Sequence, residues 1–309
     1  MKYYLGIDTS NYTTSAAVCD NENVLHNMKI PLKVNPGERG LRQNDAVFLH
    51  TRNIPVLLEG LKQYGYKYNA VGCAGFPRDA ENSYMPCFLS GESAARSVAA
   101  VNNIPVYKFS HQAGHIAAAV YSSGKAELYN AEFIAFHVSG GTTEILYVNG
   151  KKIIKIGGTL DINAGQVIDR SGVKLGFGFP CGSEIEKSSL RCGEPIKVTA
   201  SVRGNYCNLS GIENKVDDMI KSDYDRDHIA KYVIESIKIT LEKLTENILN
   251  DIKYANLPVI YAGGVMGNKI ISAYLKNKFN SYFAEPEYSS DNAAGIAILC
   301  RQADEKQNG

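Results

Sequence analysis

Two histidines, His111 and His115, are four residues apart in an alanine-rich stretch that favours a helix. Residues at this spacing lie on one face of a helix, so both imidazoles would point to the same side. The chain has only six histidines, and imidazole is a common ligand of zinc and iron in proteins. The spacing therefore predicts one metal site. The alternative is a pair of unrelated histidines on a half-buried helix.

The residue after the first histidine limits what a metal bound there would do. In the His-Glu-x-x-His motif of metalloproteases, the glutamate is the general base that activates metal-bound water. Gln112 occupies that position here, and a neutral amide cannot accept the proton. The pattern predicts metal binding but gives no support for peptide hydrolysis.

Two aspartates are candidates for further polar roles. Asp291 is expected at the start of a helix, where it would act as an N-cap, or as an oxygen ligand if that helix packs beside the histidines. Asp169 lies in an amphipathic run, in which an unpaired carboxylate would be costly. We expect it to bind a ribose hydroxyl or a cation, or to form a salt bridge with Arg170 or Lys174.

Glycine turns follow strands or bracket helices at four places in the second half of the chain. These turns are Ser139-Gly140-Gly141, Gly157-Gly158, Gly176-Phe-Gly178 and Gly263-Gly264. Backbone N–H groups approach a phosphate closely where no side chain intervenes, and a helix N-terminus adds positive potential. Each turn alone is more typical of a structural turn. Together they favour a nucleotide-binding site.

The elements that would position these residues follow the same plan twice. The pattern predicts strands at 3–7, 13–19, 71–74 and 105–109 with helices at 41–64 and 92–100, then strands at 132–138, 144–148, 152–156 and 258–261, a helix at 161–169 beginning near Asp161, a long helix from residue 225 and a last helix near residue 291. Each half opens with a strand, a polar turn and a returning strand. We therefore predict an α/β protein with two duplicated domains around a nucleotide cleft, divided into residues 1–122 and 123–309, with the last helix packing back toward the cleft.

Composition excludes some classes of protein. The 33 basic and 32 acidic residues give a net charge of +1, which argues against binding nucleic acid through charge alone. The seven cysteines include no Cys-x-x-Cys pair, which predicts reduced thiols and a cytoplasmic location. The sequence has no apolar run suited to a signal peptide or a bilayer span, so we expect no membrane association.

Several ordered motifs, spread almost from end to end, resemble one known family. They are Gly6-Ile-Asp-Thr-Ser10, His111-Gln-Ala-Gly-His115, Val138-Ser-Gly-Gly-Thr142, Gly158-Thr-Leu-Asp-Ile-Asn-Ala-Gly165 with Asp169, Gly176-Phe-Gly-Phe-Pro-Cys-Gly182, Ala262-Gly-Gly-Val-Met-Gly-Asn268 and Ser290-Asp-Asn-Ala293. With these motifs the chain resembles the universal threonylcarbamoyl-transferase family of tRNA modification enzymes. That family lies in the actin and hexokinase superfamily and was once described as glycoprotein endopeptidases.

The resemblance implies an acyltransferase that moves a threonylcarbamoyl group from threonylcarbamoyl-adenylate to N6 of the adenosine beside the tRNA anticodon. It also implies roles for particular residues: iron or zinc binding by His111, His115 and Asp291, a nucleotide cradle at His137, Val138, Ser139, Gly140 and Gly141, completed by Asp169, Gly182 and Asn268, and a polar positioning role near the reacting group for Asp8. A role for Asp8 as general base is the alternative. The family usually works on tRNA with accessory proteins, so a smaller paralogous partner or a homodimer is expected.

The chain departs from the family pattern in three places. Residues 74–84 replace a Gly-Pro-Gly loop, Ser139-Gly-Gly-Thr-Thr-Glu144 replaces Ser-Gly-Gly-His-Thr-Gln, and Asp161-Ile162 replaces a pair of acids. In the first segment, Arg78, Asp79 and Glu81 would either remake the contacts of the lost loop or decorate a solvated turn. These changes suggest a divergent paralogue.

The departures leave two alternatives to tRNA modification. One is transfer of a carbamoyl-type group to another acceptor, and the other is a catalytically idle binding or assembly partner. A kinase of the same superfamily would need acids to hold magnesium, but would not need paired histidines. The transferase hypotheses predict both a bound metal and a pocket for a carbamoyl-adenylate.

Overall fold

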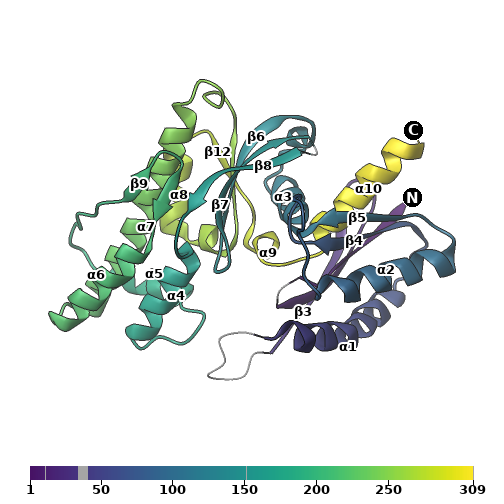
Figure 1. The fold of residues 1–309 in the computed structure, drawn as a ribbon, viewed down its shortest axis with the longest axis horizontal. Helices are drawn as coiled ribbons and strands as arrows, with labels where there is room; N and C mark the ends of the chain where they lie inside the picture. The colour runs from purple at the N-terminus through teal and green to yellow at the C-terminus, as the bar shows by residue number, and fades with distance from the viewer. Residues whose placement is uncertain (11, 34–40, 151, 309) are drawn as a thin grey trace. The chain divides into compact units, whose positions relative to one another are not determined.

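The computed structural model describes residues 1–10, 12–33, 41–150 and 152–308. It divides the chain into two compact units (Figure 1). Unit 1 contains Met1–Gly124 together with Ser290–Gly309, and unit 2 contains Lys125–Ser289.

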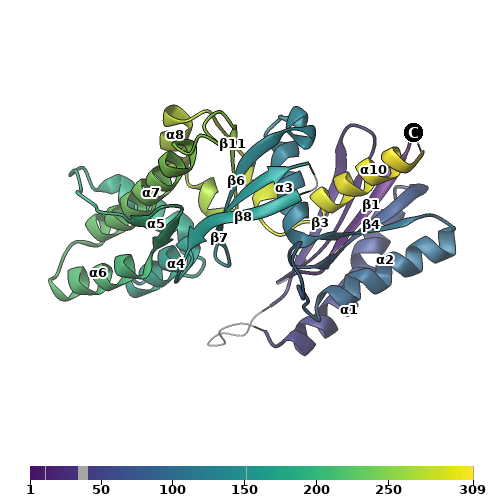
Figure 2. The ribbon, with the colours of Figure 1, turned by 45° about the horizontal axis from the view of Figure 1, so that its top comes forward.

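Unit 1 is built on a five-stranded sheet in the order β3-β2-β1-β4-β5. Its elements are β1 (Tyr3–Asp8), β2 (Thr13–Cys19), β3 (Val24–Pro31), α1 (Gln43–Lys62), β4 (Tyr68–Phe76), α2 (Phe88–Asn102), β5 (Val106–Ser110), α3 (His111–Ser122) and α10 (Ala294–Asn308). β1, β2 and β3 form an antiparallel meander, whereas β4 and β5 run parallel to β1. Helices α1 and α2 cover one face of this sheet and α10 covers the other (Figures 1 and 2).

The coverage of both faces explains the composition of the central strands. β1 and β2 are buried along nearly their whole length, and their sequences are nearly continuous apolar or small residues. A sheet covered on both faces requires this pattern, because neither set of alternating side chains meets water. Asp8 ends β1 and is the exception, so a buried carboxylate lies at the end of an apolar strand.

Unit 2 contains a seven-stranded sheet in the order β12-β11-β6-β7-β8-β10-β9. Its elements are η1 (Ala126–Asn130), β6 (Glu132–Val138), β7 (Thr143–Asn149), β8 (Lys152–Thr159), α4 (Ala164–Lys174), α5 (Gly182–Arg191), β9 (Ser201–Arg203), β10 (Tyr206–Asn208), α6 (Ser210–Lys221), α7 (Arg226–Leu249), β11 (Val259–Ala262), η2 (Gly264–Gly267), α8 (Lys269–Lys278), β12 (Ser281–Phe283) and α9 (Pro286–Ser289). Apolar residues of α7, such as Ile229, Val233 and Ile237, lie in its main hydrophobic core. That role matches the helical spacing of these residues in the sequence.

The two sheets share one topology, which confirms the predicted duplication. In unit 2, β6, β7 and β8 form an antiparallel meander, and β11 and β12 run parallel to β6. The order β8-β7-β6-β11-β12 therefore repeats the order β3-β2-β1-β4-β5. In each unit, the turn between the first two strands occupies the same topological position.

The division of the chain differs from the predicted one chiefly at the C-terminal end. Residues 123–309 were expected to form the second domain, but residues 290–309 belong to unit 1. The reason is packing, since α10 contacts β1, β2, β4 and α3. Along the described residues, no helix combines the length and apolar character needed to cross a bilayer. The seven cysteines are free thiols.

Candidate functional site

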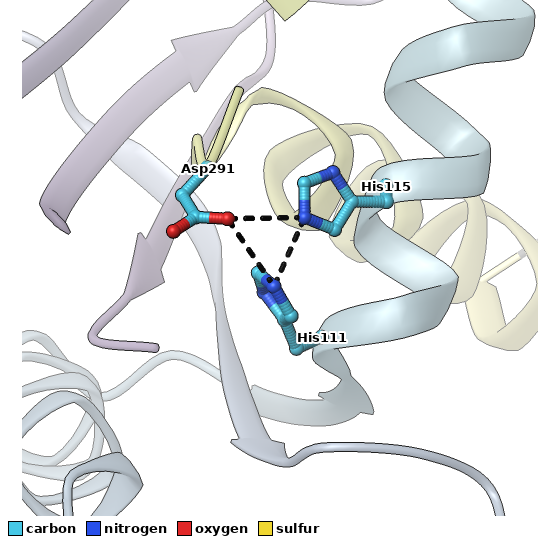
Figure 3. A group of neighbouring side chains, drawn as sticks. All are labelled: His111, His115 and Asp291. Carbon is cyan, nitrogen blue, oxygen red and sulfur yellow. Dashed lines mark hydrogen bonds and ion pairs between the residues drawn. The ribbon is translucent and has the colours of Figure 1, made fainter. Parts of the chain in front are cut away.

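The two histidines are brought together by the start of α3. Ser110 has an extended backbone conformation, and its hydroxyl accepts the backbone N–H of Ala113 at 3.1 Å. This is an N-cap, which fixes the beginning of the helix at the next residue. His111 and His115 then lie one turn apart, with their Nε2 atoms separated by 2.9 Å (Figure 3).

Asp291 reaches the histidines because α3 and α10 approach each other closely. A Cβ atom on Gly295 would lie 1.8 Å from the Gly114 carbonyl oxygen, so only glycine permits this approach. Asp291 lies three residues before the first residue of α10. Its Oδ1 atom lies 3.3 Å from Nε2 of His115 and 3.6 Å from Nε2 of His111 (Figure 3).

A neighbouring side chain binds the first backbone N–H of α10. The side chain of Asn292 accepts the backbone N–H of Ala294 at 3.0 Å. The sequence pattern had offered the N-cap role to Asp291 as an alternative. Its carboxylate instead faces the two histidines.

The three donor atoms fit a divalent metal ion. They lie within 4.8 Å of one another, and metal–ligand bonds of about 2.0–2.1 Å place neighbouring donors about 2.9–3.4 Å apart. Two imidazole nitrogens and one carboxylate oxygen suit both iron and zinc, and such a set leaves coordination positions for other ligands. A metal at this site would be held by residues of unit 1 alone.

Asp8 binds the first histidine from the side opposite the metal donors. Its Oδ2 atom lies 2.7 Å from Nδ1 of His111, and its Oδ1 atom accepts the backbone N–H of Ser10 at 2.8 Å. The Asp8 side chain is 1 % exposed. A carboxylate that accepts Nδ1–H fixes the tautomer whose Nε2 lone pair can bind a metal.

The charges of the cluster favour a cation at its centre. Burial alone would lower the pKa of His111, but Asp8 and Asp291 outweigh burial and raise it to about 10. The pKa of His115 is lowered by burial and by the charge of His111. Burial would raise the pKa of both carboxyl groups, but their interactions with the histidines hold it below the usual range. Two carboxylates therefore stabilise one positive charge, which in the metal-free protein is a proton.

One polar atom beside Asp8, between β1 and β2, is available to bind a ligand. The Ser10 hydroxyl is buried and has no hydrogen-bond partner among the described residues. Its own backbone N–H binds Asp8. Burying a hydroxyl without a partner is costly, so this position favours a bound polar group.

The residues predicted to cradle a nucleotide all belong to unit 2. His137 and Val138 end β6, and the following residues 139–142 form a turn that we call the glycine turn. A Cβ atom would meet nothing within 4 Å at either Gly140 or Gly141. The start of α4 packs against the turn, because Gly165 donates its N–H to the Ser139 carbonyl at 3.1 Å and its own Cβ position lies 2.5 Å from the Gly140 nitrogen.

Three further candidates lie on elements connected to this turn. Asp169 on α4 accepts the backbone N–H of Cys181 at 2.8 Å, directly before Gly182 at the start of α5. Asn268 caps α8 by accepting two backbone N–H groups, which leaves its amide NH₂ as the group with which it could contact a ligand. The N–H of Lys269 also binds the side chain of Glu186 on α5.

One of the two alternatives for Asp169, a salt bridge with Arg170 or Lys174, is wrong. Arg170 and Lys174 pair with Glu213, and Asp169 binds the Cys181 amide instead of either of them. Burial raises the pKa of Asp169, and the hydrogen bond from Cys181 partly opposes the rise.

The helix expected at 161–169 begins later, at Ala164, so Asp161 lies before it. Asn163 caps α4, whereas Asp161 accepts the backbone N–H groups of Leu209 and Ser210 at 2.8 and 3.0 Å. It therefore stabilises the start of α6, which the sequence pattern had not identified.

The family model and the relatives found by sequence agree on one family. The model of the family described as tRNA N6-adenosine threonylcarbamoyltransferase matches residues 84–298. A tRNA N6-adenosine threonylcarbamoyltransferase of Phocaeicola vulgatus is 30% identical over 321 residues, covering 95% of this chain and 91% of that protein. A probable bifunctional tRNA threonylcarbamoyladenosine biosynthesis protein of Methanothermobacter thermautotrophicus is 27% identical over 302 residues, covering 96% of this chain and 54% of that protein. The chain thus spans about half the length of the bifunctional relative.

A solved structure also matches the fold. Full-length HypF, crystallised in a phosphate- and nucleotide-bound form, superposes with a TM-score of 0.66 at 12% identity, covering all of this chain and 47% of HypF. At this identity the match shows the fold alone. Together with the duplicated sheets, it supports the actin and hexokinase-like class predicted from the sequence.

Proposed function

This chain belongs to the tRNA N6-adenosine threonylcarbamoyltransferase family of acyltransferases, and we propose that it transfers a threonylcarbamoyl group from threonylcarbamoyl-adenylate to N6 of the adenosine beside the tRNA anticodon. In this reaction the adenosine amine attacks the carbamoyl carbon. A new N–C bond forms, the C–O bond to the adenylate phosphate breaks, AMP leaves and the amine loses a proton.

The proposal rests chiefly on the convergence of His111, His115 and Asp291, with donor atoms at metal-like spacing. These residues would hold one divalent iron or zinc ion. When bound, such an ion supplies Lewis-acid polarisation of a carbonyl oxygen. Asp8 would act on this site by orienting His111, because its two carboxylate oxygens already accept hydrogen bonds. Its lowered pKa makes it a weak base, so we assign it a positioning role in preference to general base.

The nucleotide part of the donor would bind to unit 2. The glycine turn has open space at Gly140 and Gly141, where a Cβ would meet nothing within 4 Å. The Ser139 hydroxyl accepts the N–H groups of Gly141 and Thr142, and the compact turn so formed would let an adenylate phosphate approach its backbone closely. Asp169 is a candidate for a ribose hydroxyl, and Gly182 and Asn268 would contribute backbone and amide donors. The balanced net charge suggests that tRNA is recruited with an accessory protein or a second copy of the chain, in the cytoplasm.

The burial of the cluster supports an active enzyme over an idle partner. The residues His111, His115 and Asp8 are each less than a tenth exposed to solvent. Each is also within hydrogen-bond distance of another member of the cluster. An idle partner would place no constraint on these side chains. A buried polar network persists only when its members satisfy one another or a ligand.

The test combines metal content with tRNA modification. Purified wild-type protein is expected to hold about one equivalent of iron or zinc and to form threonylcarbamoyladenosine from threonylcarbamoyl-adenylate and unmodified tRNA, with accessory proteins supplied. The double variant His111→Ala/His115→Ala should lose both properties, whereas His228→Ala in unit 2 should keep both. Metal binding without tRNA modification would redirect the proposal to another acceptor. Equal metal content in wild type and double variant would refute the metal site.

A further inference from the structure

The segment after β4 contacts the first turn of α3, the helix that carries His111 and His115, at two points. The Ser110 hydroxyl donates to Oδ2 of Asp79 at 2.6 Å, and the backbone N–H of Gln112 donates to the Pro77 carbonyl at 3.1 Å. The same Ser110 hydroxyl accepts the N–H of Ala113. The segment therefore satisfies groups that the N-terminus of a helix leaves without intrahelical partners.

The first of these contacts fixes a group that would otherwise rotate. A serine hydroxyl can turn about its Cβ–Oγ bond and donate in several directions. Ser110 is fully buried, and a carboxylate at 2.6 Å is a short, charge-assisted acceptor. Asp79 thus sets the direction in which Ser110 donates and leaves its lone pair aimed at Ala113. A negative charge at this end of α3 is also favourable for the helix dipole.

This contact lies directly beside the metal donors. Ser110 is the residue before His111 and caps α3. The cap determines where the helix begins and in which direction the His111 side chain points. The two Nε2 atoms must stay near their 2.9 Å separation to share one ion. A loosened cap would let His111 depart from this geometry while His115, one turn further along, stays in place.

A solvated turn is one of the two alternatives that the sequence leaves for this segment. For Asp79 the structure gives a different role, because its carboxylate binds a buried residue of α3. The loop that it replaces reads Gly-Pro-Gly in the family that the motifs resemble, and such a loop has no carboxylate to offer. The contact is made by the segment in which this chain departs from that pattern.

We propose that Asp79 is a positioning residue for the metal site and acts through the Ser110 cap on His111. The inference rests on the proposed metal site. It predicts that Asp79→Ala weakens the binding of Co²⁺ to the metal-free protein by about threefold to tenfold, which is the scale of a lost helix cap. It also predicts faster amide hydrogen exchange at Ala113 in the metal-free protein.

Asp79→Asn separates positioning from charge. Its amide oxygen can still accept from Ser110 although its charge is gone, so we expect Asn to restore most of the Co²⁺ affinity. Glu81→Ala, which removes an exposed acid two residues further along the same segment, is the matched control and should bind Co²⁺ like wild type. In a Ser110→Ala background, Asp79→Ala should have little additional effect, because the residue through which it acts is absent.

The outcomes separate a positioning role of Asp79 from an effect of its charge, and both from the metal site itself. If Asp79→Asn and Asp79→Ala lose the same affinity, charge alone is responsible and the positioning role is wrong. If Asp79→Ala matches wild type in both Co²⁺ affinity and Ala113 exchange, the inference fails while the metal site stands. If wild type and His111→Ala bind Co²⁺ equally, the metal site fails, and the exchange rate at Ala113 still tests whether Asp79 supports the cap.

Discussion

Replacing Asp8 with asparagine tests how the cluster is organised, because the change removes one acceptor and almost no volume. Both carboxylate oxygens of Asp8 accept hydrogen bonds, one from the Ser10 backbone and one from Nδ1 of His111. Asparagine has one oxygen and one NH₂ group. In either orientation of its amide, one of these two donors would face another donor.

The size of the effect follows from this conflict. With the NH₂ group toward His111, Nδ1 must become the acceptor and the proton moves to Nε2, where it blocks the metal. With the NH₂ group toward Ser10, a buried N–H loses its partner, at a cost of about 1–3 kcal/mol. Changes to residues that orient metal-bound histidines weaken metal binding by about 10–100-fold, or about 1.4–2.7 kcal/mol. We expect Asp8→Asn to fall in this range.

The assay is a titration of the metal-free protein with Co²⁺, monitored through the visible absorption of the bound Co²⁺. The spectrum also reports the coordination geometry. Asp20→Asn is the matched control, because Asp20 is also a buried acid of unit 1 and accepts two backbone N–H groups in the β2–β3 turn. It should leave Co²⁺ affinity unchanged. If the Co²⁺ affinity of Asp8→Asn is within about threefold of wild type and the spectrum is unchanged, Asp8 does not orient His111 for metal binding and the carboxylate–histidine–metal arrangement is wrong.

Three further predictions concern packing and pH. Gly295→Ala would place a Cβ against the Gly114 carbonyl, so it should lower stability to urea by about 1–3 kcal/mol and weaken Co²⁺ binding; unchanged values would contradict the close helix contact. Gly165→Ala should displace the glycine turn and weaken AMP binding by about tenfold in calorimetry, whereas Gly211→Ala, which meets nothing within 4 Å, should not. In the metal-free protein, His111 has a pKa raised from 6.5 to about 10, so its contribution to stability is complete below pH 6.5 and is lost as the pH rises through about 10. Metal affinity should rise over the same window, because the ion replaces the proton; a flat profile would show that His111 does not titrate there.

The parts of the site that lie within one element could be predicted from the sequence. The four-residue spacing of His111 and His115 is a local property of a helix, and α3 forms over both residues as expected. The serine before them is also a recognisable N-cap signal, although sequence reasoning did not use it. Helical periodicity similarly identified α7, which begins at Arg226 after its cap at Asp225.

The contacts between distant parts of the chain could not be predicted in the same way. The pattern left Asp291 open between a cap and a ligand, since the choice depends on how α10 packs on α3. The partners of Asp169 and Asp161 lie 12 and 48 residues away. Short-range rules assign an acid to nearby bases or to its own helix, and here long-range backbone donors were the partners instead.

The duplicated fold suggests how two kinds of ligand chemistry arise from one plan. In unit 1, the first strand ends in Asp8, and its carboxylate contributes to a buried negative site that suits a cation. In unit 2, the corresponding strand ends in Val138 and is followed by the glycine turn, whose open glycine backbone suits the close approach of an anion. The strand and the turn occupy the same topological positions in both sheets, and the residues at these positions differ. We therefore expect substitutions at Asp8 to alter metal affinity without changing AMP binding, and substitutions at Gly165 to do the reverse.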